Sequence, residues 1–191
     1  MISIGITGII GSGKSMLSQV FRSMDIPVYD ADSNAKILMN NDARIREKLI
    51  ENFGAETYIN GKLNKEHLSR EIFRNEDKRL LINSIVHPIV KDDFIEWRRK
   101  SNRKIVAIES AILFEAKIDD ILDSIIFVTS AEEILIKRII FRDKVDEITA
   151  RKKIEIQKKI SGIEKSDRIF INDASHSLIE QATEFINNIT N

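Results

Sequence analysis

The chain has 191 residues, and its 30 Lys and Arg residues balance 30 Asp and Glu residues to a formal net charge of zero. With 42% hydrophobic and 31% charged residues it has a globular composition, and the neutral balance argues against a protein whose main task is to coat nucleic acid or an anionic membrane. The lack of cysteine excludes disulfides, a thiol nucleophile and Cys-based metal centres, and the 3 histidines lie too far apart for a local metal motif.

Short runs rich in Ile and Val alternate with longer amphipathic segments along the chain. The runs have the length and composition of strands buried on both faces, so the alternation predicts an α/β fold with a five-stranded parallel sheet and crossover helices. In chain order, we expect strands at residues 2–6, 26–29, 105–108, 125–128 and 169–171. Helices are expected at residues 14–24, 42–51, 65–73, 77–100, 131–141, 146–160 and 178–189. The charged, mostly helical stretch 34–100 is interpreted as an insert carried above the sheet.

The strongest motif follows the first predicted strand, where the sequence GIIGSGKS at residues 8–15 fits G-x-x-x-x-G-K-[ST] at every fixed position. Gly8, Gly11 and Gly13 allow the backbone to curl so that successive N–H groups point at phosphate oxygens. The helix that begins near Lys14 adds its positive dipole end at the same place. The Lys14 ammonium group is expected to reach the β- and γ-phosphates, and the Ser15 hydroxyl to ligate Mg²⁺.

Three neighbours of these fixed positions are further candidates for the phosphate site. Ser12 lies within the loop and offers a backbone N–H group. Thr7 is either a turn residue or a contact on the phosphate side. Met16 is expected to turn its side chain toward the core while its backbone N–H group remains available at the start of the helix.

A phosphate loop leaves open a small-molecule kinase, a GTPase switch and an ATPase module. The nearest string to the guanine-binding motif Asn-Lys-x-Asp is NKEH at residues 64–67, which lacks the Asp. The sequence also has neither an Asp-x-x-Gly switch nor the Leu-Ser-Gly-Gly-Gln signature of transporter ATPases. These absences favour a kinase.

Two aspartates, Asp30 and Asp32, follow the second predicted strand. Ligands of open parallel sheets bind beyond the carboxyl ends of the strands, so these carboxylates are expected beside the phosphate loop. A carboxylate at this place can accept the proton of an attacking hydroxyl group. Alternatively, Asp32 caps a helix that starts at Ser33, and the two roles can coexist.

A basic segment, residues 137–165, has a net charge of +5 within the neutral chain. Phosphoryl transfer needs cations on the equatorial oxygens and needs water to be excluded, and a mobile basic helix would supply both. Arg138 and Arg142 lie four residues apart and therefore share a helix face. The alternative is a solvated helix face without a role in chemistry.

Together these motifs resemble the dephospho-coenzyme A kinase family, and the similarity runs over nearly the whole chain. The loop is common to many families, whereas the combination of the other pieces is more specific. These pieces are VYDAD at 28–32, NSIVHP at 83–88, LFE at 113–115, Lys137-Arg138, Arg142-Asp143, Gln157 and SDRIFIN at 166–172.

The resemblance implies a P-loop kinase-like, three-layer α/β/α fold with a helical insert and a lid. It divides the chain into a nucleotide-binding core, residues 1–33 and 101–191, with a lid at about 138–162, and a substrate-binding insert, residues 34–100. The implied reaction is ATP-dependent phosphorylation of the ribose 3′-hydroxyl of dephospho-coenzyme A, the last step of coenzyme A synthesis. The alternatives are another small-molecule or nucleoside monophosphate kinase, and a non-catalytic nucleotide-binding switch.

The resemblance also implies residue roles. Asp32 is the general base, Lys14 and Arg138 neutralise the migrating phosphoryl group, and His87 helps to hold the acceptor substrate. Arg142 is expected near the nucleotide, and Asp30 near the substrate.

The sequence departs from the family pattern at three places near the loop. Ile9 replaces a second Gly, and Met16 replaces a Thr whose hydroxyl could touch the α-phosphate. Glu109 ends a strand where Val is common, and we expect it to orient Mg²⁺ through water or to contact the substrate. No apolar run approaches the roughly 18 residues of a membrane span, and no signal-peptide pattern is visible, so a cytoplasmic enzyme is expected. We expect a monomer, with an oligomer as the alternative.

Overall fold

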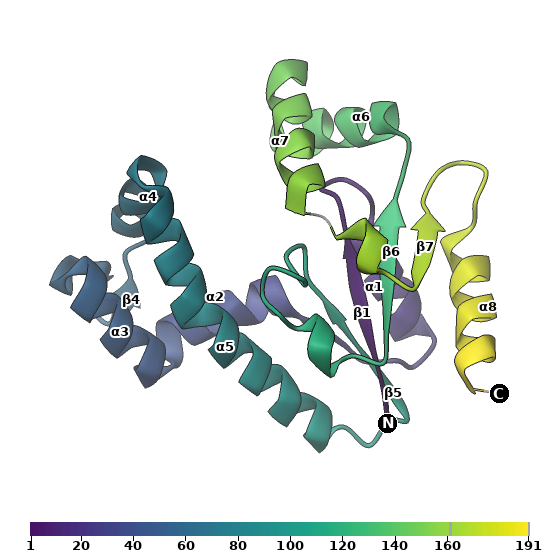
Figure 1. Ribbon diagram of the computed structural model, residues 1–191, viewed down its shortest axis with the longest axis horizontal. Coiled ribbons are helices and arrows are strands. Elements are labelled where there is room, and N and C mark those ends of the chain that lie inside the picture. The colour runs from purple at the N-terminus through teal and green to yellow at the C-terminus, as the bar shows by residue number, and fades with distance from the viewer. Residues whose placement is uncertain (161, 191) are drawn as a thin grey trace. The chain divides into compact units, whose positions relative to one another are not determined.

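The computed structural model describes residues 1–160 and 162–190, and the chain divides into two compact units (Figure 1). The core unit comprises Met1–Asp30 and Ser101–Asn191, and the insert unit comprises Ala31–Lys100. The structural boundary therefore falls three residues before the predicted one, and Asp32 belongs to the insert unit. Within the described residues, no helix has the length and apolar character needed to cross a bilayer.

The core unit contains the predicted parallel sheet of five strands. Ile and Val dominate the strands because β-branched side chains pack well on a pleated surface that is covered on both sides. The strand order, β2-β5-β1-β6-β7, places β1 at the centre and brings the carboxyl ends of all five strands to one edge. The strands are β1 (Ile2–Gly8), β2 (Val28–Asp30), β5 (Ile105–Glu109), β6 (Ser124–Thr129) and β7 (Arg168–Ile171).

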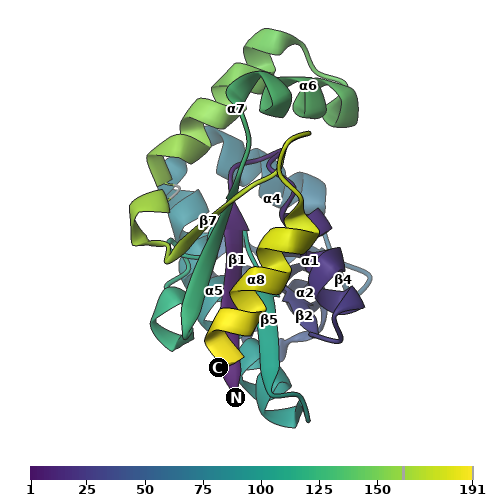
Figure 2. The ribbon, with the colours of Figure 1, turned by 90° about the vertical axis from the view of Figure 1, so that its right-hand side faces the viewer.

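Two helices cover one face of this sheet, α1 (Lys14–Ser23) and α8 (Leu178–Thr190), as Figure 2 shows. Their apolar side chains form one core cluster with the strands, in which Leu17, Phe21 and Phe185 meet Ile4 and Ile126. On the opposite face, Gly5 leaves room for the segment between β5 and β6. A Cβ atom at Gly5 would lie within 2.8 Å of side-chain atoms of Leu113 and Leu122.

The basic segment forms two helices, α6 (Glu132–Asp143) and α7 (Glu147–Ile160), beyond the carboxyl ends of β1 and β6 (Figure 1). We call them the lid helices. The predicted lid, about 138–162, starts inside α6, and its residue 161 lies outside the described residues. Leu135, Ile136 and Ile139 of α6 pack with Ala150 and Ile154 of α7, which joins the two helices to each other. A short 3-10 turn, Ile163–Lys165, precedes β7.

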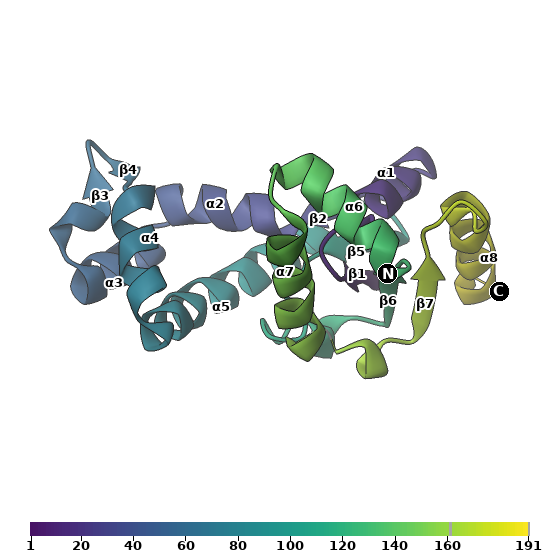
Figure 3. The ribbon, with the colours of Figure 1, turned by 90° about the horizontal axis from the view of Figure 1, so that it is seen from above.

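The insert unit is helical, and within it α2 and α5 lie side by side (Figure 3). Asp42 caps α3 because its carboxylate accepts hydrogen bonds from the N–H groups of Arg44 and Ile45. The elements are α2 (Ala31–Asn41), α3 (Ala43–Phe53), a 3-10 turn (Ala55–Thr57), β3 (Tyr58–Ile59), β4 (Lys62–Leu63), α4 (Lys65–Arg74) and α5 (Glu76–Lys100).

The seven predicted helices and five predicted strands are present, each within two residues of its expected ends. The sequence analysis missed the β3–β4 hairpin, and it considered a helix near α2 only as the alternative in which Asp32 caps a helix starting at Ser33. The hairpin turn is Asn60-Gly61, in which both residues have positive φ, so the Asn-Gly pair was a usable signal. Helix α2 gave a weaker signal, since it contains Ser33, Asn34 and two terminal asparagines, which are poor helix formers.

Candidate active site

The phosphate loop connects β1 to α1 in a conformation that requires its glycines. Gly8, Gly11 and Gly13 have φ angles of +148°, +81° and +102°, which L-residues with side chains rarely adopt. Space is equally restricted: a Cβ atom at Gly8 would lie 2.2 Å from the carbonyl oxygen of Val128, and one at Gly13 would lie 1.9 Å from Asn172 Nδ2. The loop is therefore held between β6 and the end of β7.

Lys14 is the first residue of α1, and its side chain folds back over the loop. Its Nζ atom donates to the carbonyl oxygens of Gly8 at 3.0 Å and Ile9 at 3.4 Å. Ser12 is fully buried, and its Oγ atom makes no hydrogen bond within the described part of the chain. The Lys14 ammonium group is therefore held against the loop main chain, beside a pocket in which it can meet an anion.

Glu109 ends β5 next to the loop and accepts two hydroxyl hydrogen bonds. Its Oε1 atom accepts from Ser15 Oγ at 2.9 Å, and its Oε2 atom accepts from Ser18 Oγ at 2.6 Å. The sheet register pairs Glu109 with Asp30 of β2 and with Ile6 of β1, so Asp30 reaches the same edge from the neighbouring strand. Ser18 was not predicted, although Ser15 and Ser18 are three apart and so share a helix face.

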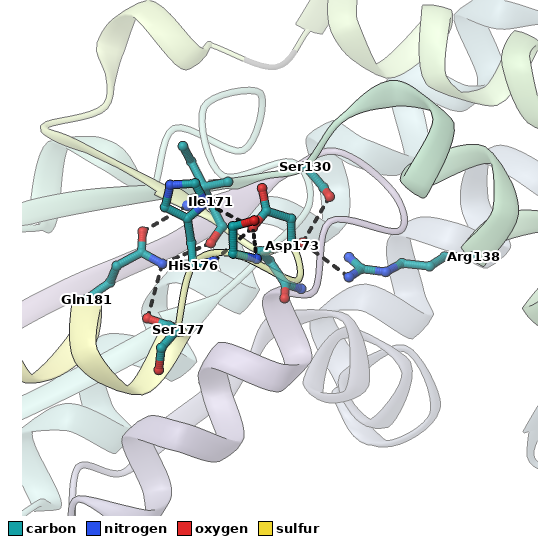
Figure 4. A network of polar contacts seen from close by, with 9 residues as sticks. Ser130, Arg138, Ile171, Asp173, His176, Ser177 and Gln181 are labelled. Carbon is teal, nitrogen blue, oxygen red and sulfur yellow. Dashed lines mark hydrogen bonds and ion pairs between the residues drawn. The ribbon is translucent and has the colours of Figure 1, made fainter.

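A second group of contacts joins the loop to α6 and to the end of β7. Arg138 donates through Nη1 to the carbonyl oxygens of Gly11 at 3.2 Å and Ser12 at 3.4 Å, and through Nη2 to that of Asn172 at 3.1 Å. The buried Asn172 side chain donates to the carbonyl oxygen of Ser12 at 2.7 Å. Ser130 Oγ also donates to the Asn172 carbonyl oxygen, at 2.9 Å, and Figure 4 shows Arg138 and Ser130 converging there.

The turn after β7 is held by its own side chains (Figure 4). The Asp173 carboxylate accepts from the N–H groups of Ser175 and His176 and contacts His176 Nδ1 at 2.9 Å. The hydrogen bond from His176 holds the pKa of Asp173 below its ordinary value. Gln181 of α8 bonds to both the N–H and the carbonyl group of Ile171, which closes the exposed edge of β7.

An open pocket of about 340 Å³ lies between the loop and α6. It places Lys14 and Ser15 opposite Arg138 and Arg142, so three cations face one space. Arg142 is also bound by its neighbour Asp143, which accepts from Arg142 Nε at 2.7 Å and from Lys153 Nζ at 2.6 Å. These two cations hold the pKa of Asp143 well below its ordinary range. The lining is Gly11, Gly13, Lys14, Ser15, Arg138, Phe141 and Arg142.

The other predicted residues divide between the two units. Thr7 is buried in β1 immediately before the loop. Met16 differs from expectation, because its side chain is 54% exposed instead of facing the core. The proposed cap at Asp32 is also wrong: α2 begins at Ala31, so Asp32 is the second residue of the helix and is exposed. His87 lies half-buried on α5 of the insert unit.

Comparison with known proteins places this architecture in one family. The family model described as dephospho-CoA kinase matches residues 2–178. The chain belongs to the dephospho-CoA kinase family. A dephospho-CoA kinase of Porphyromonas gingivalis is 37% identical over 191 residues, covering 99% of this chain and 95% of the relative.

Solved structures share the fold. A crystal structure of TT1252 from Thermus thermophilus aligns with a TM-score of 0.83 at 24% identity, covering 100% of this chain and 98% of that one. A dephospho-CoA kinase from Campylobacter jejuni aligns with a TM-score of 0.70 at 21% identity, covering 98% and 96%. Membership of the dephospho-CoA kinase family makes the chain an ATP-using phosphotransferase, which agrees with a loop built to hold phosphates.

Proposed function

We propose that this chain transfers the γ-phosphoryl group of ATP to the ribose 3′-hydroxyl of dephospho-coenzyme A, giving coenzyme A and ADP. The observation that carries the proposal is the three-cation pocket over the phosphate loop, in a chain whose family is that of the dephospho-CoA kinases. In the transition state, negative charge is spread over the equatorial oxygens of the migrating phosphoryl group. Cations that already lie around this group stabilise that charge.

Lys14 and Arg138 are the proposed neutralising residues, and both are held by hydrogen bonds to main-chain carbonyl oxygens. The N–H groups of the loop would take the remaining phosphate oxygens, as in other loops of this type. Two of the proposed donors, the N–H groups of Ser12 and Met16, also donate to the carbonyl oxygens of Ile9 and Gly13, each at 3.0 Å. Met16 contributes to this set only through its N–H group, because its side chain points to solvent. Thr7 and Arg142 complete the proposed nucleotide contacts. Arg142 lines the pocket, whereas Thr7 is buried at the end of β1 just before the loop.

The oxygen groups around Ser15 suit Mg²⁺. A hydroxyl and a carboxylate within 2.9 Å of each other are hard oxygen donors of the kind that Mg²⁺ takes, together with phosphate oxygens and water. Ser15 would hold the ion directly and Glu109 would orient it. When bound, the ion would neutralise charge on the β- and γ-phosphates. Among the described residues, no group of three or more His, Cys, Asp or Glu side chains could form an all-protein metal site.

Asp32 is the proposed general base for the attacking hydroxyl group. Its carboxylate is exposed in the first turn of α2, two residues after Asp30, and a carboxylate can accept that proton. We assign His87 on α5 to the acceptor substrate, together with the insert unit as a whole. The cytoplasmic location and the monomeric state stay predictions.

The acceptor is tested by incubating the protein with ATP and Mg²⁺ and with either dephospho-coenzyme A or a panel of nucleosides and nucleoside monophosphates. We expect phosphorylation of dephospho-coenzyme A alone. Product from the panel but not from dephospho-coenzyme A would overturn the proposed acceptor.

The general base is tested by Asp32→Asn. Because the variant keeps the shape of the side chain and removes its basicity, turnover should fall by roughly 10² or more with ATP binding nearly unchanged. Glu51→Gln, at an exposed position on α3 of the same unit, is the matched control and should leave turnover within twofold. Wild-type turnover in Asp32→Asn would remove Asp32 from this role.

A further inference from the structure

A glutamine of the lid helix α7 reaches the main chain of the phosphate loop. Gln157 Oε1 accepts a hydrogen bond from the Ile10 N–H group at 2.5 Å, across 147 residues of sequence. The loop is also attached by packing, since Ile9 is only 7% exposed and lies in one cluster with the apolar side chains of α6 and α7. Ile10 packs against the same cluster. The first half of the loop is therefore part of the lid's own core.

The bond acts on the peptide unit between Ile9 and Ile10. The Ile9 carbonyl and the Ile10 N–H belong to one plane and point in opposite directions. While Gln157 takes the N–H group, the Ile9 carbonyl oxygen accepts from the Ser12 N–H group at 3.0 Å and from Lys14 Nζ at 3.4 Å. The orientation of this single plane therefore links the lid helix to the loop lysine.

Losing the acceptor would leave the Ile10 N–H group without its partner in a half-buried place, which is costly. Rotation of the peptide plane toward another partner would turn the Ile9 carbonyl oxygen away from Ser12 and Lys14. The loop would then lose one of the contacts that hold the lysine in place. The position of α7 and the shape of the phosphate loop are thus physically coupled.

We propose that Gln157 is a positioning residue for phosphoryl transfer, which fixes the Ile9–Ile10 peptide and, through it, Lys14. The proposal rests on the proposed function, in which this loop holds the phosphates of ATP. It also gives the Ile9 side chain a role, because this side chain anchors the loop in the lid cluster. Displacement of α7 from the loop breaks the bond, so a correctly shaped loop requires a docked lid helix.

The contact is tested by amide hydrogen exchange at Ile10 in the nucleotide-free, full-length protein. Gln157→Met keeps the side-chain length and removes the acceptor, and Gln157→Asn keeps a polar group that is too short to reach the loop. In both variants exchange at Ile10 should be about tenfold faster, the effect of losing one hydrogen bond, while exchange in the rest of α7 is unchanged. Gln157→Glu keeps an acceptor and should retain protection. Lys152→Met, at an exposed position on the same helix, is the control.

The role is tested by steady-state kinetics with dephospho-coenzyme A. Gln157→Met and Gln157→Asn, which both lose the contact, should lower kcat about tenfold and leave KM for dephospho-coenzyme A unchanged, because Gln157 acts through Lys14. Wild-type exchange at Ile10 in either variant would overturn the contact, and faster exchange with unchanged kcat would overturn the positioning role. A wild-type protein inactive toward dephospho-coenzyme A would instead contradict the proposed function, and the exchange measurement would still decide the contact.

Discussion

Arg138 differs from Arg142 in what holds its guanidinium group. Arg138 donates to three main-chain carbonyl oxygens, two of the phosphate loop and one at the end of β7. Arg142 is exposed and bound to the adjacent Asp143 side chain. A planar fork with fixed donors can bridge several acceptors, whereas an ammonium group is a single point charge. The two arginines should therefore respond differently to the same substitution.

Arg138→Lys should lower kcat at least about tenfold, because one ammonium group cannot replace charge-assisted bonds to three carbonyl oxygens. Arg142→Lys is the matched control on the same helix face and should cost no more than about threefold, since its charge is retained and its partner is the adjacent side chain. Steady-state kinetics with ATP and dephospho-coenzyme A measures both. The reverse order of effects would mean that Arg142 is the arginine on which transfer depends.

At the scale of elements, ion pairs join the lid helices in addition to their apolar packing, and one of these pairs is formed by Asp143. Asp143 ends α6 and accepts from Lys153 of α7 as well as from Arg142. Both cations favour its charged form, which is why its pKa lies well below its ordinary range. A lowered folded-state pKa contributes stability that is fully present above the unfolded-state pKa and is lost as pH falls from there toward the folded-state pKa.

Asp143→Asn should lower Tm at neutral pH, because it removes the charge that both cations bind. The difference in Tm from wild type should be constant between about pH 5 and pH 8 and should shrink below about pH 4, where Asp143 of the unfolded wild-type chain begins to bind a proton while the folded chain does not. Thermal unfolding across this pH range measures the effect. Glu155→Gln, at an exposed position on α7, should show a smaller difference. A difference that grows toward low pH would contradict the assigned sign.

At the scale of the whole molecule, sequence reasoning succeeded where the information is local. The spacing of GIIGSGKS predicted the loop, and the runs of Ile and Val predicted the strands of the sheet. It missed the contacts of Asn172 with Ser12 and of Gln157 with Ile10, since these join residues 160 and 147 positions apart. No periodicity encodes which carbonyl or N–H group a distant amide side chain will meet. Gln157 and Asn172 were noticed only as parts of family motifs, without a role.

The division of the chain into two compact units leads to a prediction about where each substrate acts. The proposed ATP contacts all lie in the core unit, whereas His87 and Asp32 lie in the insert unit. A ligand stabilises the segments whose opening destroys its site, by about 2.7 kcal/mol at a concentration of 100 times Kd. Hydrogen exchange should therefore report the binding of each substrate separately.

With a non-hydrolysable ATP analogue at that concentration, exchange in residues 8–18 should slow by up to about 100-fold, and exchange in residues 43–72 should stay within twofold of the free protein. Adding dephospho-coenzyme A should then slow exchange on α5 around His87. Lys14→Ala is the control, because in this variant the ATP analogue should no longer slow hydrogen exchange in residues 8–18. Equal slowing of residues 43–72 by the ATP analogue alone would show that the insert unit takes part in nucleotide binding, and the assignment of one substrate to each unit would fall.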